Sequence, residues 1–245
     1  MSLRDGGRLL CIGDVHGCAA ELEVLLRAIA PAQADRLVFL GDYVDRGTES
    51  RATLDLLLEL REKLPRAVFL RGNHEEMMLA YLGFGGDGAE IFLRAGGAAT
   101  LASYGLDVRA SGAPSADEVR RRFPAAHLEF LSGALRLHYE DGPYLFVHAG
   151  VRPGRSLDRQ EPRDLLWIRE EFLTAEHGLA QTVVFGHTPL REVWFQPHRK
   201  IGLDTGCVFG GRLSALDLTE GVLHQVRRGV GRVESRSVGE ELLPR

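Results

Sequence analysis

Short apolar runs recur along the chain, and each ends in glycine or alanine beside polar residues that can bind a metal ion. Such runs are typical of buried strands, which fix the position of the loop that follows them. Because the ends of adjacent parallel strands meet at one edge of a sheet, we expect the loop side chains to converge. The runs and the polar segments that follow them are Leu9–Ile12 with GDVHG, Leu37–Leu40 with GDYVDRG, Val68–Leu70 with RGNHE, Leu145–Val147 with HAG, and Val183–Phe185 with GH.

Helical periodicity follows the first three runs. Apolar residues between positions 22 and 29 repeat at the i, i+3, i+4, i+7 spacing of an amphipathic helix, and Pro31 follows its end. Two further helices are expected at residues 48–64 and 75–82. Strand, loop and helix thus alternate three times, which predicts an α/β fold with a largely parallel sheet in this half.

The pattern changes between the third and fourth runs. Residues 83–88 are rich in glycine, and helical stretches are expected near 90–104 and 116–131. Ser115 and Glu118 form a plausible capping box at the start of the second stretch. This helical insertion, about residues 82–135, could lie over the site as a partial lid that selects substrates. It could also be a packing subdomain that never touches substrate.

The second half of the chain contains short strands that are mostly linked by turn residues, which indicates mainly antiparallel pairing. These strands are expected at residues 144–147, 182–185, 201–203, 213–218 and 222–227. Beyond residue 227 little periodicity remains, so residues 228–245 are expected to form a flexible tail. We therefore predict a single domain over residues 1–227.

Composition narrows the class of protein. The chain has 245 residues, 44% of them hydrophobic, and a formal net charge of −4. These values suit one globular domain and give no general attraction to nucleic acid or anionic lipid. The first residues carry no apolar signal region, and no apolar run is long enough to span a membrane. We expect a cytoplasmic monomer with no nucleic-acid or membrane partner, whose three cysteines are reduced.

The polar segments supply carboxylate, imidazole and carboxamide groups but no thiolate, which suits a metal centre with nitrogen and oxygen ligands. GDVHG, GDYVDRG, GNHE, HAG and GH together resemble the five signatures of the calcineurin-like metallophosphoesterases. GDYVDRG and GNHE resemble its phosphoprotein phosphatase branch, and LLWIRE, FGHTP and LDTGCVF resemble the small bacterial and bacteriophage lambda-type Ser/Thr phosphatases. The resemblance implies a four-layer β-sandwich core flanked by helices, with the insertion between GNHE and HAG.

The resemblance also implies two divalent metal ions, with Mn preferred and Fe, Zn, Co or Ni as alternatives. One ion would take Asp14, His16 and Asp42 as ligands. The other would share Asp42 and add three more ligands, which are Asn73, His148 and His187. Two such ions can activate a bridging water for in-line attack at phosphorus.

Substrate phosphate needs further positive charge, and Arg46 and Arg169 are the candidates, together with the Asn73 carboxamide. For Arg169 a surface ion pair is an alternative, because the motif around it is short. His74 is the candidate general acid for the leaving group, and Asp45 is the residue expected to orient it, as in the Asp–His pair of the family.

Three functions remain open from the sequence. The favoured one is hydrolysis of phosphoserine, phosphothreonine or phosphotyrosine in proteins, with a phosphorylated protein or a small phosphorylated molecule as partner. The alternative is hydrolysis of diadenosine tetraphosphate or another small nucleotide at the same dinuclear centre. A catalytically dead binding module is a third reading, which the complete set of expected ligand positions disfavours.

Overall fold

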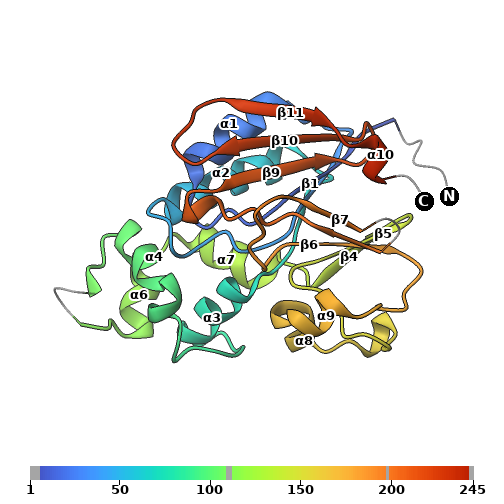
Figure 1. The fold of residues 1–245 in the computed structure, drawn as a ribbon. Coiled ribbons are helices and arrows are strands. Elements are labelled where there is room, and N and C mark those ends of the chain that lie inside the picture. Colours follow the sequence, from blue (N-terminus) through green and yellow to red (C-terminus); the bar gives the residue numbers. More distant parts are fainter. Residues whose placement is uncertain (1–5, 109–111, 197–198, 243–245) are drawn as a thin grey trace.

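The computed structural model describes residues 6–108, 112–196 and 199–242, and it consists of two packed sheets with helices on their outer faces (Figure 1). The first sheet has six strands, which are in spatial order β11 (Val233–Ser237), β10 (Val222–Arg227), β9 (Arg212–Asp217), β1 (Leu9–Ile12), β2 (Arg36–Phe39) and β3 (Val68–Phe69). The second has five strands, which are β4 (His138–Asp141), β5 (Tyr144–Val147), β6 (Thr182–Phe185), β8 (Lys200–Gly202) and β7 (Trp194–Gln196).

Alternation of side chains along β1 divides the interior into layers. Leu10 and Ile12 belong to a cluster with apolar residues of α1 (Ala19–Ile29) and α2 (Ser50–Lys63). Leu9 and Cys11 point the other way, into a cluster shared with residues of the second sheet. The outer face of the second sheet packs against α8 (Pro162–Trp167) and α9 (Glu170–Thr174). The order helix, sheet, sheet, helix confirms the expected four-layer α/β sandwich.

Strand directions agree with the sequence prediction in the first half and differ from it in the second. β1, β2 and β3 are parallel, as the repeated strand–helix pattern predicts. β9 pairs antiparallel with β1, and β10 and β11 continue that pattern. In the second sheet, however, β5, β6 and β8 are mutually parallel. The prediction of mainly antiparallel pairing was wrong there, because α8 and α9 form a crossover between β5 and β6.

The insertion is helical, but its helices are shorter than the sequence pattern suggests. After α3 (Asn73–Tyr81), a π-helical turn η1 (Leu93–Gly97) leads into α4 (Ala98–Ser103), and α6 (Ala116–Arg122) and α7 (Ala125–Gly133) follow. The stretch expected at 116–131 is two helices, because Pro124 disfavours the helical conformation at Phe123, which is extended. Ser115 accepts the predicted capping hydrogen bond from the backbone N–H of Glu118.

Residues beyond 227 differ from the predicted flexible tail. β11 completes the first sheet by pairing with β10, and a short helix α10 (Gly239–Leu242) follows it. Val238, between them, is fully buried. The side chains of β11 are mostly exposed and polar, so the strand is held by backbone pairing and leaves no hydrophobic pattern in the sequence. Residues 243–245 of the predicted tail lie outside the described residues.

The remaining elements are short. They are the 3₁₀ turns η2 (Leu157–Arg159) and η3 (Cys207–Phe209). Among the helices of the described residues, none combines the length and the apolar character that a membrane span requires.

Candidate metal centre and active site

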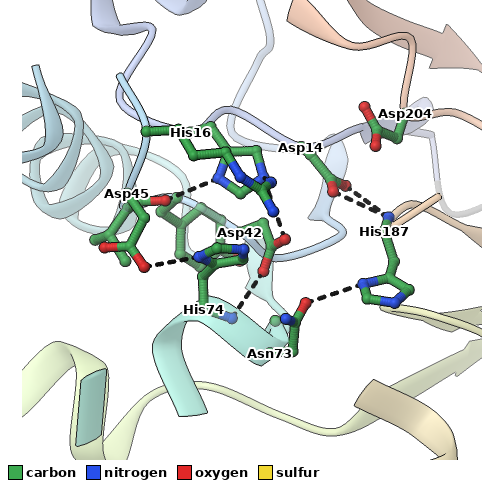
Figure 2. Close-up of polar contacts among 12 residues, drawn as sticks. Asp14, His16, Asp42, Asp45, Asn73, His74, His187 and Asp204 are labelled. Carbon is green, nitrogen blue, oxygen red and sulfur yellow. Dashed lines mark hydrogen bonds and ion pairs between the residues drawn. The ribbon is translucent and has the colours of Figure 1, made fainter. Parts of the chain in front are cut away.

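The strand ends of both sheets bring the predicted residues to one place (Figure 2). The loops after β1, β2 and β3 carry Asp14, Asp42 and the start of α3, and the loops after β5 and β6 carry His148 and His187. Buried strands hold all these loops, so the side chains are positioned before any ligand binds.

Backbone strain is concentrated in the same loops. Within the described residues, six non-glycine residues have positive φ, and five of them belong to this site. Such conformations cost free energy for residues with a Cβ atom and persist where the surrounding structure enforces them. The five are His16, Asp42, Asp45, Arg46 and His187, with φ values of 46°, 52°, 73°, 69° and 62°. These strained backbone conformations direct the five side chains toward the centre of the site.

His16 is oriented as a metal ligand. Its Nδ1 atom lies 2.9 Å from the Val44 carbonyl oxygen, to which Nδ1–H can donate. Nε2 then presents a lone pair, and it lies 3.3 Å from Asp42 Oδ2. A positive charge on or beside these atoms stabilises the contact: although burial opposes it, the neighbouring Asp42 carboxylate raises the pKa of His16. The Arg46 guanidinium, which contacts Nε2, supplies one positive charge here.

The other side of Asp42 has the same character. His148 Nδ1 lies 2.8 Å from the Leu40 carbonyl oxygen, which leaves Nε2 as a lone pair. That Nε2 is 3.0 Å from Asn73 Oδ1 and 3.3 Å from Asp42 Oδ1, both of which are also acceptors. His187 Nδ1 is 2.9 Å from the same Asn73 oxygen. Three acceptors facing one another suit a shared cation.

The protonation state of His187 bears on whether its Nδ1 atom, which faces Asn73 Oδ1, fits a metal ion. Its Nε2 atom is buried and has no hydrogen-bond partner, which is costly for a polar atom. Burial and the neighbouring His148 lower the pKa of His187 to about 2. Burial also lowers the pKa of His148. Both imidazoles are therefore neutral near pH 7, the form that binds metal ions.

Carboxylates complete the donor set. Burial, followed by the charges of Asp204 and Asp42, raises the pKa of Asp14 well above its usual value. Burial likewise raises the pKa of Asp204, which lies at the edge of the centre. Buried acids that resist ionisation in each other's presence favour a bound cation. The donor set therefore fits divalent metal ions.

Asp14 is a predicted ligand that lies outside both groups of donors around Asp42. The two groups of three donors around Asp42 contain His16 with His74, and His148 with His187, but not Asp14. Asp14 instead accepts the backbone N–H of His187, at 2.9 Å to Oδ2. Its carboxylate thus links the loop after β1 to the loop after β6.

The predicted acid and its partner form a buried pair. His74 Nδ1 lies 2.7 Å from Asp45 Oδ2, and both side chains are at most 1% exposed. The His74 ring stands almost perpendicular to that of His16, with centroids 4.7 Å apart. Nδ1–H can thus be donated to Asp45, which leaves Nε2 for a substrate.

Two predicted phosphate-binding arginines flank the centre at different depths. Arg46 is half-buried, touches His16 and lies 5.4 Å over the ring of Phe209. Arg169 is exposed at the start of α9, and its charge contributes to the lowered pKa of His187. Arg46 therefore lies beside the predicted ligand His16, and Arg169 lies near the predicted ligand His187.

Supporting residues that the sequence did not assign hold these groups in place. The Glu75 carboxylate accepts backbone N–H groups of Asp42, Tyr43, Val44 and Gly72 at 2.7–3.2 Å. Thr100 Oγ1 accepts the Asp45 backbone N–H at 2.7 Å and donates to Asp45 Oδ1 at 2.7 Å. Glu75 lies in the GNHE motif and could have been found there, whereas Thr100 lies 55 positions from Asp45 in a region without a motif.

A second group of candidate ligands is already satisfied by the protein. Cys18, Glu21 and Cys207 lie close together and buried. The Glu21 carboxylate is bound by the Arg228 guanidinium and by the Gly229 backbone N–H. All three cysteines of the chain are free thiols, as expected.

Comparison with known proteins agrees with this geometry. The calcineurin-like phosphoesterase family matches residues 7–218. The chain is similar to the asymmetrical bis(5′-nucleosyl)-tetraphosphatase PrpE of Anoxybacillus flavithermus, at 28% identity over 236 residues that span 85% of this chain and 89% of the relative. The PrpE protein of Geobacillus thermodenitrificans is 29% identical over 235 residues, with the same shares.

Solved structures show the same fold. A candidate diadenosine tetraphosphatase superposes with a TM-score of 0.66 at 28% identity, covering 92% of this chain and 95% of that one. A cold-active protein tyrosine phosphatase superposes with a TM-score of 0.65 at 19% identity, covering 94% and 79%, which shows a shared fold alone. From the family match over most of its length and the ligand geometry at its strand ends, this chain belongs to the calcineurin-like phosphoesterases, hydrolases with a dinuclear metal centre.

Proposed function

We propose that this protein hydrolyses dinucleoside tetraphosphates asymmetrically, releasing a nucleoside triphosphate and a nucleoside monophosphate. The observation that carries the proposal is the similarity to PrpE relatives along 85% of this chain and 89% of theirs. The candidate diadenosine tetraphosphatase among the solved structures supports it.

The sequence-based preference for a phosphoprotein phosphatase was wrong. Its basis was the form of the GDYVDRG and GNHE segments, which contain the metal ligands and the Asp45–His74 pair. Those groups act on the phosphorus and carry no information about what is attached to it. The relatives that are 28–29% identical are tetraphosphatases, whereas the solved protein phosphatases share only 15–19% identity and thus only the fold.

In this proposal the six predicted ligands hold two divalent ions, with Mn²⁺ preferred among metals that accept nitrogen and oxygen donors. The ligands are Asp14, His16, Asp42, Asn73, His148 and His187. When bound, such ions supply positive charge that polarises the phosphate and acidifies the attacking water. Arg46 and Arg169 pair with the phosphate oxygens, which a guanidinium can bind in a bidentate manner.

The reaction breaks one P–O bond and needs one proton at the leaving oxygen. Water adds to the α-phosphorus, and the bond to the bridging oxygen toward the other three phosphates breaks. His74 is the proton donor, acting from Nε2 because Nδ1 is held by Asp45. A triphosphate oxygen is far less basic than the alkoxide that leaves from a serine phosphate. Hydrolysis of the tetraphosphate therefore depends less on protonation by His74.

The proposal also includes the oligomeric state, location and partners of the protein. We infer that it acts as a monomer in the cytoplasm on a small nucleotide, without nucleic-acid or membrane partners. The net charge of −4 supports the absence of such partners, because a negative protein is not attracted to nucleic acid or to an anionic membrane.

The test is chromatography of nucleotides after incubating metal-stripped protein with Mn²⁺ and diadenosine tetraphosphate. We expect ATP and AMP in equal amounts. A His148→Ala preparation made in parallel controls for contaminating hydrolases. ADP as the sole product, or no turnover of this substrate, would contradict the proposal.

A further inference from the structure

Beside the metal centre lies a hollow of about 420 Å³ that no step described so far uses. It separates the loop after α3 from α8, two segments that lie next to each other at the same end of the molecule (Figure 1). Its volume is within the range of small-molecule sites. The lining residues are Asp87, Gly88, Glu90, Ile91, Arg163 and Trp167.

Trp167 connects this groove to the metal ligands. It is the last residue of α8, and its ring lies 6.5 Å from the His187 ring at an angle of 77°. The Asp45–His74 pair lies at the opposite end of the centre, beside His16 (Figure 2). A group leaving toward His74 therefore departs away from Trp167.

The chemistry of the substrate requires room for a nucleoside beside the reaction axis. A phosphomonoester carries three free oxygens on the reacting phosphorus, whereas the α-phosphorus of a dinucleoside tetraphosphate also carries a nucleoside. That nucleoside is neither the attacking nor the leaving group, so it must lie to the side of the reaction axis. Its ribose is joined to the reacting phosphorus, and its base lies beyond the ribose.

The side chains of the groove suit a nucleoside better than a phosphate chain. Trp167 offers an indole face, on which any base can stack. Asp87 and Glu90 can accept hydrogen bonds from ribose hydroxyls, as acidic residues do in dinucleotide-binding folds. These two carboxylates outnumber the one guanidinium of the lining, that of Arg163, so the groove is on balance unfavourable for the highly charged polyphosphate chain.

The loop wall of the groove is held against the catalytic helix. Gly88 has a φ of +86°, and a Cβ atom there would lie 2.8 Å from Met77 Cγ in α3. At Gly86 a Cβ atom would lie 2.8 Å from Glu76 Oε1, also in α3. Because α3 begins with Asn73 and His74, the groove is fixed relative to the reacting atoms.

We propose that this groove binds the nucleoside attached to the phosphorus under attack, with its base stacked on Trp167 and its ribose hydroxyls bound by Asp87 or Glu90. This inference rests on the proposed function. It assigns the substrate selectivity of the site to residues 87–91 and α8.

The test compares two substrates on each variant. Diadenosine tetraphosphate has the nucleoside, and p-nitrophenyl phosphate has none. In Trp167→Ala, kcat/KM for the nucleotide relative to the aryl phosphate should fall about ten- to a hundredfold, from the lost stacking. Trp167→Phe should restore most of that ratio. Phe84→Ala is the matched control, because Phe84 is an exposed aromatic of the same loop that does not line the groove.

A second readout does not need turnover of diadenosine tetraphosphate, because it measures the inhibition of p-nitrophenyl phosphate hydrolysis by AMP. AMP should inhibit the wild type competitively, and its inhibition constant should rise about tenfold or more in Asp87→Ala/Glu90→Ala and in Trp167→Ala. A substrate ratio and an inhibition constant that stay within twofold of wild type in folded variants would overturn the groove assignment while leaving the proposed function intact. A wild type that does not cleave diadenosine tetraphosphate would instead overturn the proposed function.

Discussion

Asp45 Oδ2 and His74 Nδ1 are 2.7 Å apart in a fully buried pair that links two separate strand-end loops. We expect His74→Asn to lower kcat for diadenosine tetraphosphate by about 10²-fold, the low end for a general acid, because triphosphate is a weakly basic leaving group. Steady-state kinetics with metal content measured in the same samples checks this. His224→Asn, the same change at a distant histidine, is the control. Full activity of His74→Asn would remove His74 from the reaction.

Thr100 supports the pair from the insertion. Its hydroxyl bonds both the backbone and the carboxylate of Asp45, so Thr100→Val leaves a buried N–H without this acceptor. We expect kcat to fall about 3- to 20-fold, the equivalent of one lost hydrogen bond. The Thr100→Val/Asp45→Asn double variant should lose less than the sum of the two changes, since both act on one carboxylate. If the losses in the two single variants simply add in the double variant, Thr100 does not act through the Asp45 carboxylate.

The convergence of His187 Nδ1 and His148 Nε2 on Asn73 Oδ1 predicts that the folded protein takes up metal. Chelated protein should bind two Mn²⁺ per chain by elemental analysis, and its melting temperature should rise on addition. At a metal concentration 100 times the dissociation constant, the gain in stability is about 2.7 kcal/mol. His187→Ala should bind fewer ions and show a smaller rise, whereas His224→Ala should match the wild type. Equal uptake by His187→Ala would contradict the ligand assignment.

His127 should make stability depend on pH away from the metal centre. Burial lowers its pKa, although Asp55 at 3.0 Å opposes that change. The unfolded chain, with a histidine pKa of about 6.5, then binds a proton more readily than the folded one. Wild-type stability gained at this site is present above pH about 6.5 and is lost as pH falls toward the folded pKa.

Urea unfolding of wild type and His127→Gln between pH 8 and pH 5 measures this effect. The wild-type advantage in free energy of unfolding should shrink as pH falls. An advantage that is constant or grows toward low pH would contradict the assignment. Metal-free samples of both proteins should be compared, so that titration of the metal-binding side chains is the same in each and cancels from the difference.

The position of attack can be read from an isotope label. Hydrolysis in H₂¹⁸O should place the label in the nucleoside monophosphate, since water attacks the phosphorus next to the nucleoside held beside Trp167. Mass spectrometry of the two products distinguishes this from label in the triphosphate. Label in the triphosphate would mean that the nucleoside monophosphate is the leaving group and departs toward His74.

The sequence predicted the parts of the site that short motifs encode. Asp42, Asn73 and His148 follow strands whose apolar runs are visible, and the structure brings them together. It did not predict β11, whose side chains are exposed and whose stability comes from backbone pairing. It also missed Thr100, because a contact across 55 positions leaves no local pattern. The substrate was misjudged for a related reason, since the motifs describe the phosphorus site and not the groove around Trp167.

The placement of β1 between β2 and β9 has a consequence for how the protein is made. The Leu9 backbone N–H bonds the Thr219 hydroxyl across 210 positions, and Asp14 bonds the His187 backbone across 173. At ribosomal speeds of about 5–20 residues per second, the first strand emerges roughly 10–35 s before residue 187. During that interval Asp14 lacks the His187 backbone N–H, and Asp42 lacks the His148 imidazole until residue 148 has emerged. The metal centre is therefore completed late in synthesis, and a nascent chain that stalls before residue 187 should neither retain the ions nor bury its first sheet.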